Sequence, residues 1–475
     1  MIWFLLQKIG FWIFVSLTIY FVYRRKTLSL LNLYFWGMTF ATCYQFAITI
    51  WFPTKVIVLG MILCMIIYGN TKRESIVTKV IYPFVSVFFI LILFGDVMAY
   101  LLPGNYAKHI NKFLRLFNSN YSYITSTVLL FYGCFLSRGF VKKVYPSYCM
   151  AMEVAILFGV IHYFCLKMGI EFMPILREDG TVNIEAFAQV GDQIYSRIYG
   201  VSGEPKSLGF LVCPYTLLQM IMYGQGLYRF NNPIFHFCTI VVGIFALINT
   251  YSSAVIMNFA IASVLIIIFF PTGNIVRKLG PVVLGAIIIW GLFTYAKDGI
   301  SPNPKEGNFI SALYDRSFGR AEREMSGDRQ ERVILDSYFE DPNILSKVVG
   351  YGPAQYTFHV KGQTIGNGLI PVQSGLVLTL VDFGMIGICL LCWIFLILFQ
   401  VLRHSFQTES VYGIAFSIAA LSSFVGSLMF GSLPSCFIYL MLALYAYYDQ
   451  FESEVEEEFN HLEENGSSIL VEHTL

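Results

Sequence analysis

The sequence has few charged residues. Asp, Glu, Lys and Arg make up only 13% of its 475 residues, whereas soluble domains average roughly 25%. The formal net charge is +1, so no excess of one sign indicates a nucleic acid or an acidic protein as a partner. This composition argues against an ordinary soluble domain and for a chain that lies largely in lipid.

Several motifs of well-known enzyme classes are also missing. The sequence contains no Walker loop, no HExxH and no dinucleotide-binding fingerprint, which argues against ATP-driven transport by this chain alone. The ten cysteines fall within apolar stretches, so we expect no disulfide framework outside the membrane. Cys389 and Cys392 form a CxxC pair without a nearby histidine, which favours packing over metal or redox chemistry.

What the sequence does contain is long apolar blocks. A helix needs about 20 apolar residues to cross the hydrocarbon core of a bilayer, and 56% of this chain is hydrophobic. We predict an all-α integral membrane protein, a polytopic helical bundle over residues 1–448 with about 13 transmembrane helices, 12–14 being possible. Two long loops, 169–206 and 297–372, should contain short helices. Residues 449–475 are predicted to be an acidic, disordered cytoplasmic tail. The predicted spans lie near 5–23, 28–51, 54–69, 76–102, 121–137, 145–168, 207–224, 234–249, 252–271, 279–296, 373–401, 412–430 and 432–448.

Basic residues alternate between the connections, which predicts the orientation. Positively charged connections are cytoplasmic in most membrane proteins. The N-terminus and the two longest connections, 169–206 and 297–372, should therefore face the extracytoplasmic side. The basic set comprises Arg24, Arg25, Lys26, Lys72, Arg73, Arg138, Lys142, Lys143, Arg229, Arg277, Lys278 and Arg403.

The second long loop combines amphipathic segments with mixed charge. Residues 332–342 have the spacing of a short helix, and Asp341-Pro342 indicates its end. Residues 350–353 form a glycine turn. Arginine is frequent in this loop, and its planar guanidinium matches phosphate oxygens. A solvated surface of self-paired charges is the favoured explanation for most of these residues, and the excess of arginine over lysine keeps phosphate binding open.

The first long loop ends in a cation, a carboxylate and a second cation. Arg197, Glu204 and Lys206 directly precede a span and should lie near the membrane surface. Such a group can bind a lipid-linked phosphate and activate a hydroxyl. It can equally be an interfacial anchor whose long basic side chains reach the headgroups.

One segment resembles a motif of the O-antigen ligases and O-antigen polymerases (Wzy-type). Residues 373–387, QSGLVLTLVDFGMIG, are similar to the pattern H-N-x9-G-x-x-G that opens a late span in that family. Gln373 and Ser374 stand at the His-Asn positions, and Gly384 and Gly387 match the two glycines.

Three further segments between about 190 and 430 are similar to that family in the same order. Residues 327–356 resemble its element of an arginine, an amphipathic helix and Gly-x-Gly. Residues 246–261 resemble its Thr/Ser-rich junction between two middle spans, and 197–209 its earlier arginine-bearing loop. Each motif is weak alone, and their order and spacing carry the resemblance.

The resemblance implies a GT-C-like glycosyltransferase of the bacterial inner membrane with its active site on the extracytoplasmic side. Such a polymerase transfers a growing glycan from undecaprenyl pyrophosphate to a new lipid-linked repeat unit of an O-antigen, capsule or exopolysaccharide. Its partners would be those lipid-linked oligosaccharides and membrane lipid, with a chain-length regulator and a flippase as further candidates. No metal or other cofactor is expected, because arginines neutralise the pyrophosphate.

The resemblance also suggests roles for individual residues. Glu204 is the first candidate for the general base and Asp328 the second. Cations near the loops would bind the pyrophosphate, and two further residues would line the glycan path. The predicted binding residues are Arg197, Lys206, Arg329 and Arg332 for the pyrophosphate, and Tyr351 and Gln373 for the glycan.

Three functional hypotheses stay open. Gln373 stands where the ligases have a histidine, and an amide cannot act as a base, which favours a polymerase over a ligase. A transporter or flippase predicts charged residues buried in mid-span and internal inverted repeats. The mid-span charges are few, mainly Asp96, Glu153 and Asp382, and no repeat is evident.

Overall fold

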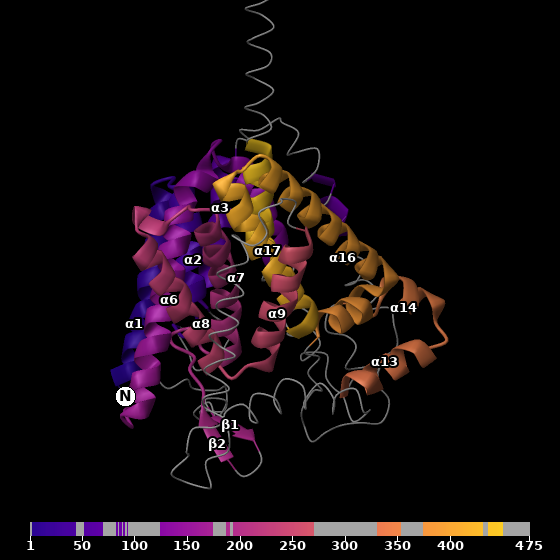
Figure 1. The fold of residues 1–475 in the computed structure, drawn as a ribbon. Coiled ribbons are helices and arrows are strands. Elements are labelled where there is room, and N and C mark those ends of the chain that lie inside the picture. Colours follow the sequence, from indigo (N-terminus) through magenta and orange to yellow (C-terminus); the bar gives the residue numbers. More distant parts are fainter. Residues whose placement is uncertain are drawn as a thin grey trace, which may run out of the picture.

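The computed structural model describes residues 2–43, 52–69, 124–173, 187–190, 193–269, 330–352, 374–430 and 436–449, with short runs between 82 and 93. Helices dominate these residues (Figure 1). Among them, five helices are long and apolar enough to cross a membrane. They are α1 (Ile2–Tyr23), α6 (Phe140–Lys167), α7 (Pro205–Gly224), α16 (Gly375–Gln407) and α17 (Val411–Phe430).

Shorter apolar helices pack among these five. They are α2 (Thr27–Thr39), α3 (Pro53–Tyr68), α8 (Pro233–Asn249), α9 (Ser253–Phe269), a helix over Ile124–Phe135 that ends in the 3-10 turn η1 (Gly133–Phe135), and a last helix over Cys436–Asp449. The chain is therefore a helical membrane protein. The predicted spans at 76–102 and 279–296 lie almost entirely outside the described residues, so the total of about 13 spans stays a prediction.

Most described helices agree with the apolar blocks, but one block is interrupted. The predicted spans 207–224, 234–249 and 412–430 match α7, α8 and α17 to within two residues. The block 28–51 does not form one helix, because α2 ends at Thr39. Beyond it, the backbone N–H and the hydroxyl of Thr42 donate to the carbonyl of Val201 at 3.2 and 3.0 Å. Apolar periodicity cannot reveal a bond to a segment so distant in sequence.

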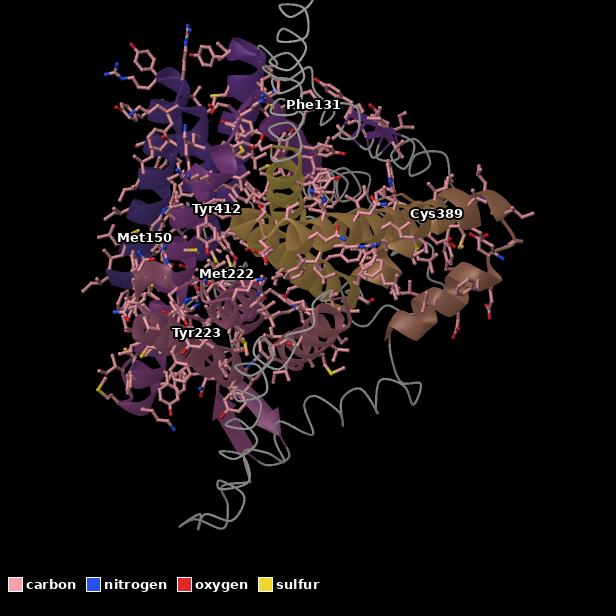
Figure 2. The ribbon with its side chains drawn as sticks, turned by 45° about the horizontal axis from the view of Figure 1, so that its top comes forward. Phe131, Met150, Met222, Tyr223, Cys389 and Tyr412 are labelled. Carbon is pink, nitrogen blue, oxygen red and sulfur yellow. The ribbon has the colours of Figure 1, made fainter. Side chains whose placement is uncertain are left out.

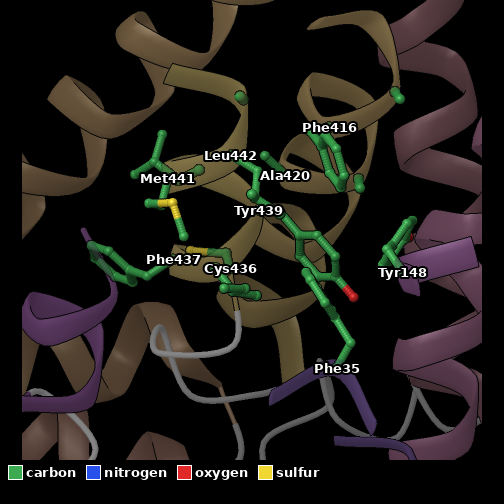
Figure 3. Packing of buried hydrophobic residues seen from close by; sticks show 14 of the residues in the cluster. Phe35, Tyr148, Phe416, Ala420, Cys436, Phe437, Tyr439, Met441 and Leu442 are labelled. Carbon is green, nitrogen blue, oxygen red and sulfur yellow. The ribbon is translucent and has the colours of Figure 1, made fainter. Parts of the chain in front are cut away.

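The interior of the bundle is formed by α7 and α17. In their most apolar stretches, 78% and 83% of the residues are buried, against 22% in α1, which lies at the edge. Tyr148 of α6 is at the centre of an aromatic cluster (Figure 3). Its ring centroid lies 5.3 Å from that of Phe35, 5.4 Å from Phe416 and 5.7 Å from Tyr439. These edge-on and tilted contacts fix how α2, α6, α17 and the last helix pack.

The two long loops contain different structures. The first carries an antiparallel hairpin of β1 (Phe187–Val190) and β2 (Gln193–Ser196), with Phe187 opposite Ser196. The prediction of short helices in both long loops is therefore wrong for this part of the first loop, where the two segments pair through their backbones instead. The second carries the short helices α13 (Gln330–Glu340) and α14 (Ile344–Val349), which confirms the predicted amphipathic segment and its end near Asp341. The hairpin and the N-terminus lie at the same end of the bundle (Figure 1), and the side of the membrane that this end faces stays a prediction.

All ten cysteines are free thiols. Cys389 and Cys392, the CxxC pair of α16, are both exposed on that helix (Figure 2). Both cysteines thus lie on the outer surface of the bundle, where small apolar side chains suit contact with lipid.

Candidate functional site

Arg197 lies against the junction between α8 and α9. Its Nε donates a hydrogen bond to the carbonyl of Thr250 at 2.9 Å, and the N–H of Ile198 donates to the carbonyl of Asn249 at 3.1 Å. Asn249 is the last residue of α8 and Thr250 is its C-cap, and carbonyls at this end of a helix lack partners within the helix. Two segments that the sequence singled out, 197–209 and 246–261, therefore meet.

His162 of α6 holds the next two residues of the loop. Its Nδ1 accepts hydrogen bonds from the N–H groups of Tyr199 (3.1 Å) and Gly200 (3.3 Å), so the proton of the neutral ring is on Nε2. The imidazole also stacks on Phe172, with ring centroids 4.7 Å apart. Gly200 has a φ of +54°, and a Cβ atom there would lie 3.1 Å from the backbone nitrogen of Gly159. The turn therefore requires glycine on both counts.

Tyr199 closes the first loop against the end of α6. Its hydroxyl donates to the carbonyl of Phe172 at 2.8 Å. Burial, together with the nearby Glu171 carboxylate, raises the pKa of Tyr199 to about 12, so the phenol keeps its proton at neutral pH. With the bonds from Thr42 to Val201, the segment 197–201 is held by α2, α6 and α8 together.

Glu204 and Lys206 mark the start of α7. Glu204 is the N-cap residue, with an extended backbone, an exposed side chain and no capping hydrogen bond from that side chain. Pro205 follows at a position where its fixed φ suits the first helical turn. Nζ of Lys206 lies 5.8 Å from the ring centroid of Phe210. Three of the predicted site residues, Arg197, Glu204 and Lys206, thus share one ordered segment beside the β1–β2 hairpin.

The start of α7 is connected to the start of α16 through α17. A Cβ atom on Gly426 of α17 would lie 3.0 Å from Cε1 of Phe210, so the two helices touch there. Two residues further along α17, the carbonyl of Leu428 accepts a hydrogen bond from Oγ of Ser374 at 3.1 Å. Ser374 also caps α16 by accepting from the N–H of Val377 at 3.4 Å. Its neighbour Gln373 lies outside the described residues.

A break in α16 joins the other two family-like segments. Gly384 has a φ of +62° and a ψ of −154° inside the helix. Just before it, the carbonyl of Val381 accepts from the N–H of Tyr351 at 2.8 Å, and that of Asp382 from Gly352 at 3.0 Å. A Cβ atom on Gly384 would lie 2.6 Å from the backbone nitrogen of Gly350. The glycines thus allow the Gly-x-Gly turn to dock directly onto the break.

The side chain of Tyr351 is buried beneath this turn. It is 3% exposed, and its hydroxyl donates to Oδ2 of Asp341 at 2.8 Å. Burial and this bond raise the pKa of Tyr351. Asp341 also accepts from Oγ of Ser346 at 3.0 Å. In this structure Tyr351 ties α13 and α14 to α16, and its predicted contact with a glycan stays a prediction. The small core around it also contains Ile334, Tyr338 and Val381.

The remaining predicted site residues cannot be placed in the same way. Asp328 and Arg329 lie outside the described residues, directly before α13 begins at Gln330. Arg332 belongs to α13, but its side chain lies outside the described part of the chain. The sequence did not indicate the positioning roles of His162, Thr42 and Asp341. His162 and Thr42 lie outside the family-like segments, and Asp341 was predicted only to end a helix. Each of the three acts on a backbone or hydroxyl group far along the chain or across a turn.

A second polar cluster lies between α6 and the turn η3 (Arg229–Asn231). Nε of Arg229 lies 2.8 Å from Oε1 of Glu153, and the hydroxyl of Tyr215 donates to the same oxygen at 2.8 Å. The two charged side chains are only 12% and 20% exposed. The N–H of Arg229 donates to Nδ1 of His236 at 3.0 Å. Glu153, one of the mid-span charges noted in the sequence, therefore has two partners within the bundle.

No protein-family model matches this chain, and no curated protein matches it. Within the part of the chain that the structure describes, no three His, Cys, Asp or Glu side chains are grouped so as to hold a metal ion. The resemblance to O-antigen polymerases thus rests on the motifs in the sequence.

Proposed function

We propose that this protein is a polysaccharide polymerase of the bacterial inner membrane, with a GT-C-like fold and its site on the extracytoplasmic side. It would transfer a growing O-antigen, capsule or exopolysaccharide chain from undecaprenyl pyrophosphate to a new lipid-linked repeat unit. The observation that carries the proposal is the hydrogen bond from Arg197 to the Thr250 carbonyl. It fixes Arg197 within the same ordered segment that carries the exposed Glu204 and the half-buried Lys206.

The reaction sets clear physical requirements. A hydroxyl oxygen of the acceptor attacks the anomeric carbon of the donor sugar, and the bond from that carbon to the pyrophosphate oxygen breaks. The products are the elongated lipid-linked glycan and undecaprenyl pyrophosphate. The leaving group carries several negative charges close to the membrane surface, and the acceptor hydroxyl loses one proton.

Each proposed residue meets one of these requirements. Arg197 and Lys206 stabilise the pyrophosphate as negative charge develops on it, with Arg329 and Arg332 completing the cationic set. Glu204 takes the proton of the acceptor hydroxyl, with Asp328 as the second candidate. Gln373 lines the path of the glycan close to the Ser374 cap, and Tyr351 is the second such candidate.

The contacts also bear on the alternatives. A ligase-like transferase would need a histidine base, and His162 is 1% exposed and occupied by two backbone N–H groups. The transporter hypothesis relies on unpaired charged residues in mid-span, and Glu153 forms an ion pair with Arg229. The first observation removes His162 as a base for a ligase, and the second pairs one of the mid-span charges on which the transporter hypothesis rests.

The test is the glycan ladder of a strain that lacks this gene and carries single variants in its place. We expect the deletion strain to make lipid-linked or surface glycan of one repeat unit. Arg197→Ala should fail to restore the ladder, because losing one charge-stabilising donor costs about 100- to 1,000-fold in rate. Arg197→Lys should restore it in part, since the charge remains but the bidentate geometry is lost.

Lys167 provides a matched control for Lys206. Lys167 is the last residue of α6 and, like Lys206, lies over an aromatic ring: its Nζ is 5.6 Å from the ring centroid of Tyr163. Lys206→Ala should shorten the ladder, and Lys167→Ala should not. Long glycan on the carrier that never reaches its final anchor would instead identify a ligase. Intact polymerisation and anchoring in the deletion strain would exclude both transferases and point to transport.

A further inference from the structure

A groove runs along the outside of the bundle between α1 and α2. It has a volume of about 470 Å³. From Phe21 to Ile13 it follows α1 for eight residues, which is about 12 Å at 1.5 Å per residue. Most of its walls are apolar, but two polar side chains of α2, Ser29 and Asn32, line the part nearer the turn between the helices. Oδ1 of Asn32 is buried and has no hydrogen-bond partner among the described residues.

Three cations lie at one end of this groove. Arg24, Arg25 and Lys26 form the whole connection between α1 and α2, and all three are exposed. The turn is well fixed, because the N–H of Lys26 donates to the carbonyl of Phe21 at 2.9 Å and that of Arg25 to Val22 at 3.1 Å. The cations also lie over tyrosine rings, with Arg25 4.5 Å from the centroid of Tyr68.

These cations have no anionic partner nearby in the chain. The first acidic residue of the sequence is Glu74, so α1, α2 and α3 contain no carboxylate. None of the three cations forms an ion pair with any residue that the structure describes. A fixed, exposed triplet of positive charges above an apolar groove is complementary to a molecule with an anionic head and a hydrocarbon chain.

We infer that the α1–α2 groove binds one anionic phospholipid, independently of the polymerase proposal. An acyl chain follows the groove, and the phosphate lies against the Arg24–Lys26 turn. A headgroup that bears a hydroxyl, as in phosphatidylglycerol, can donate the hydrogen bond that Oδ1 of Asn32 lacks. Because α1 spans the bilayer from the end that holds the β1–β2 hairpin (Figure 1), this site lies at the opposite membrane face from Arg197.

Trp36 provides a direct measurement, because it lines the groove. The full-length protein in detergent would be titrated with phosphatidylglycerol or phosphatidylcholine carrying brominated acyl chains, which quench nearby tryptophan. We expect saturable quenching at lower concentration with phosphatidylglycerol, and a clear loss of that component in Trp36→Phe. The inference would be overturned if both lipids quenched tryptophan fluorescence equally, or if Trp36→Phe kept all of the quenching by phosphatidylglycerol.

Charge and shape can then be separated. The double variant Arg24→Gln, Lys26→Gln should weaken phosphatidylglycerol binding about 10- to 30-fold, at roughly one kcal/mol for each cation near a headgroup. Lys142→Gln, Lys143→Gln is the matched control, because both lysines are exposed. They also lie at the same end of the bundle, where the hydroxyl of Tyr132 bonds to the carbonyl of Thr27. An equal loss in this control would mean general surface attraction and overturn the site.

Ser29→Phe tests the groove without changing charge. It should abolish the Trp36-dependent quenching by filling the polar end, while the protein still elutes as a single species on size exclusion. Unchanged quenching in this variant would place the lipid elsewhere. Tighter binding of a polyprenyl phosphate than of phosphatidylglycerol would also contradict the inference, since the groove would then serve a carrier lipid.

Discussion

Two arginines of this protein are held in different ways. Arg229 meets the carboxylate of Glu153 at 2.8 Å, so its charge is cancelled by a specific partner within the bundle. Arg197 donates its Nε to the carbonyl of Thr250 at 2.9 Å, which holds the guanidinium at the junction between α8 and α9. The first bond ties α6 to the turn η3 within the bundle, and the second places an arginine in the loop segment where the proposed pyrophosphate would bind.

The two glutamates differ in the same sense. Glu153 accepts hydrogen bonds from Arg229 and Tyr215 and is 20% exposed. Glu204 lies exposed at the start of α7, without a capping bond. A carboxylate that is largely buried in the bundle stabilises the fold, whereas an exposed one can exchange a proton with a substrate. The comparison predicts that substitutions of Glu153 or Arg229 change the stability of the protein, and that substitutions of Arg197 or Glu204 change the rate of glycan extension.

The largest effect is expected for Glu204→Gln. If Glu204 is the general base, removing its ability to take a proton should lower the rate of chain extension about 100- to 10,000-fold. The rate would be measured with purified protein and lipid-linked repeat units, together with thermal unfolding in detergent. We expect the unfolding temperature to change by much less than the rate, because the side chain is exposed.

Glu171 is the control for this prediction. It is an exposed glutamate at the same end of the bundle, near Tyr199. Glu171→Gln should leave the rate within a few-fold of the natural protein. If both variants are equally active, Glu204 is not the base, and Asp328→Asn becomes the decisive variant.

Arg229→Ala should mainly affect stability. Removing one member of a buried ion pair typically costs about 3–5 kcal/mol, because the other charge is left without a partner. The pair here is partly exposed, so we expect the lower end of that range, seen as a lower unfolding temperature in detergent. Folded protein that remains should extend glycan at the normal rate per molecule.

A double variant sharpens this result. Glu153→Gln, Arg229→Met removes both charges, and it should recover part of the lost stability because no lone charge remains. A rate per folded molecule that falls with Arg229→Ala and stays low in the double variant would contradict the comparison. It would show that this ion pair takes part in the reaction or in transport.

The sequence predicted the helices better than the loops, for a physical reason. Spans such as 207–224 and 412–430 are set by local apolar length, which can be read directly from the residues. The end of α2 at Thr39 and the β1–β2 hairpin depend on bonds between distant segments, such as Thr42 to Val201. Such bonds leave no periodic pattern in a single sequence.

The candidate site shows the same division. Arg197, Glu204 and Lys206 could be proposed because their residue types and their place before a span indicate phosphate chemistry. The acceptor of Arg197, Thr250, lay within a segment that the sequence had marked, but nothing in its pattern indicated the partner. The contact between Tyr351 and Asp341 needed the break at Gly384, which is a backbone feature of a helix otherwise continuous by hydropathy.

The smallest effect is expected for Tyr351→Phe. Its result decides whether Tyr351 is a structural residue, like Arg229, or part of the proposed site. If Tyr351 is a structural bond like that of Arg229, losing its hydroxyl removes one hydrogen bond and costs about 1–2 kcal/mol. Asp341 keeps Ser346 as a partner, which limits the loss. The glycan ladder should then change only as far as the amount of folded protein does.

Tyr338→Phe is the matched comparison. Tyr338 belongs to the same small core, and its hydroxyl donates to the carbonyl of Lys347 at 2.9 Å. Burial, with the nearby Asp341 carboxylate, raises its pKa to about 12, so both phenols are protonated donors at neutral pH. Equal small losses of stability with normal ladders would make both residues structural. A shortened ladder in Tyr351→Phe alone, at a normal protein level, would instead mean that the hydroxyl of Tyr351 contacts the glycan. The buried hydroxyl can reach a sugar only if it leaves Asp341, so the Gly-x-Gly turn would have to open toward the glycan during the reaction.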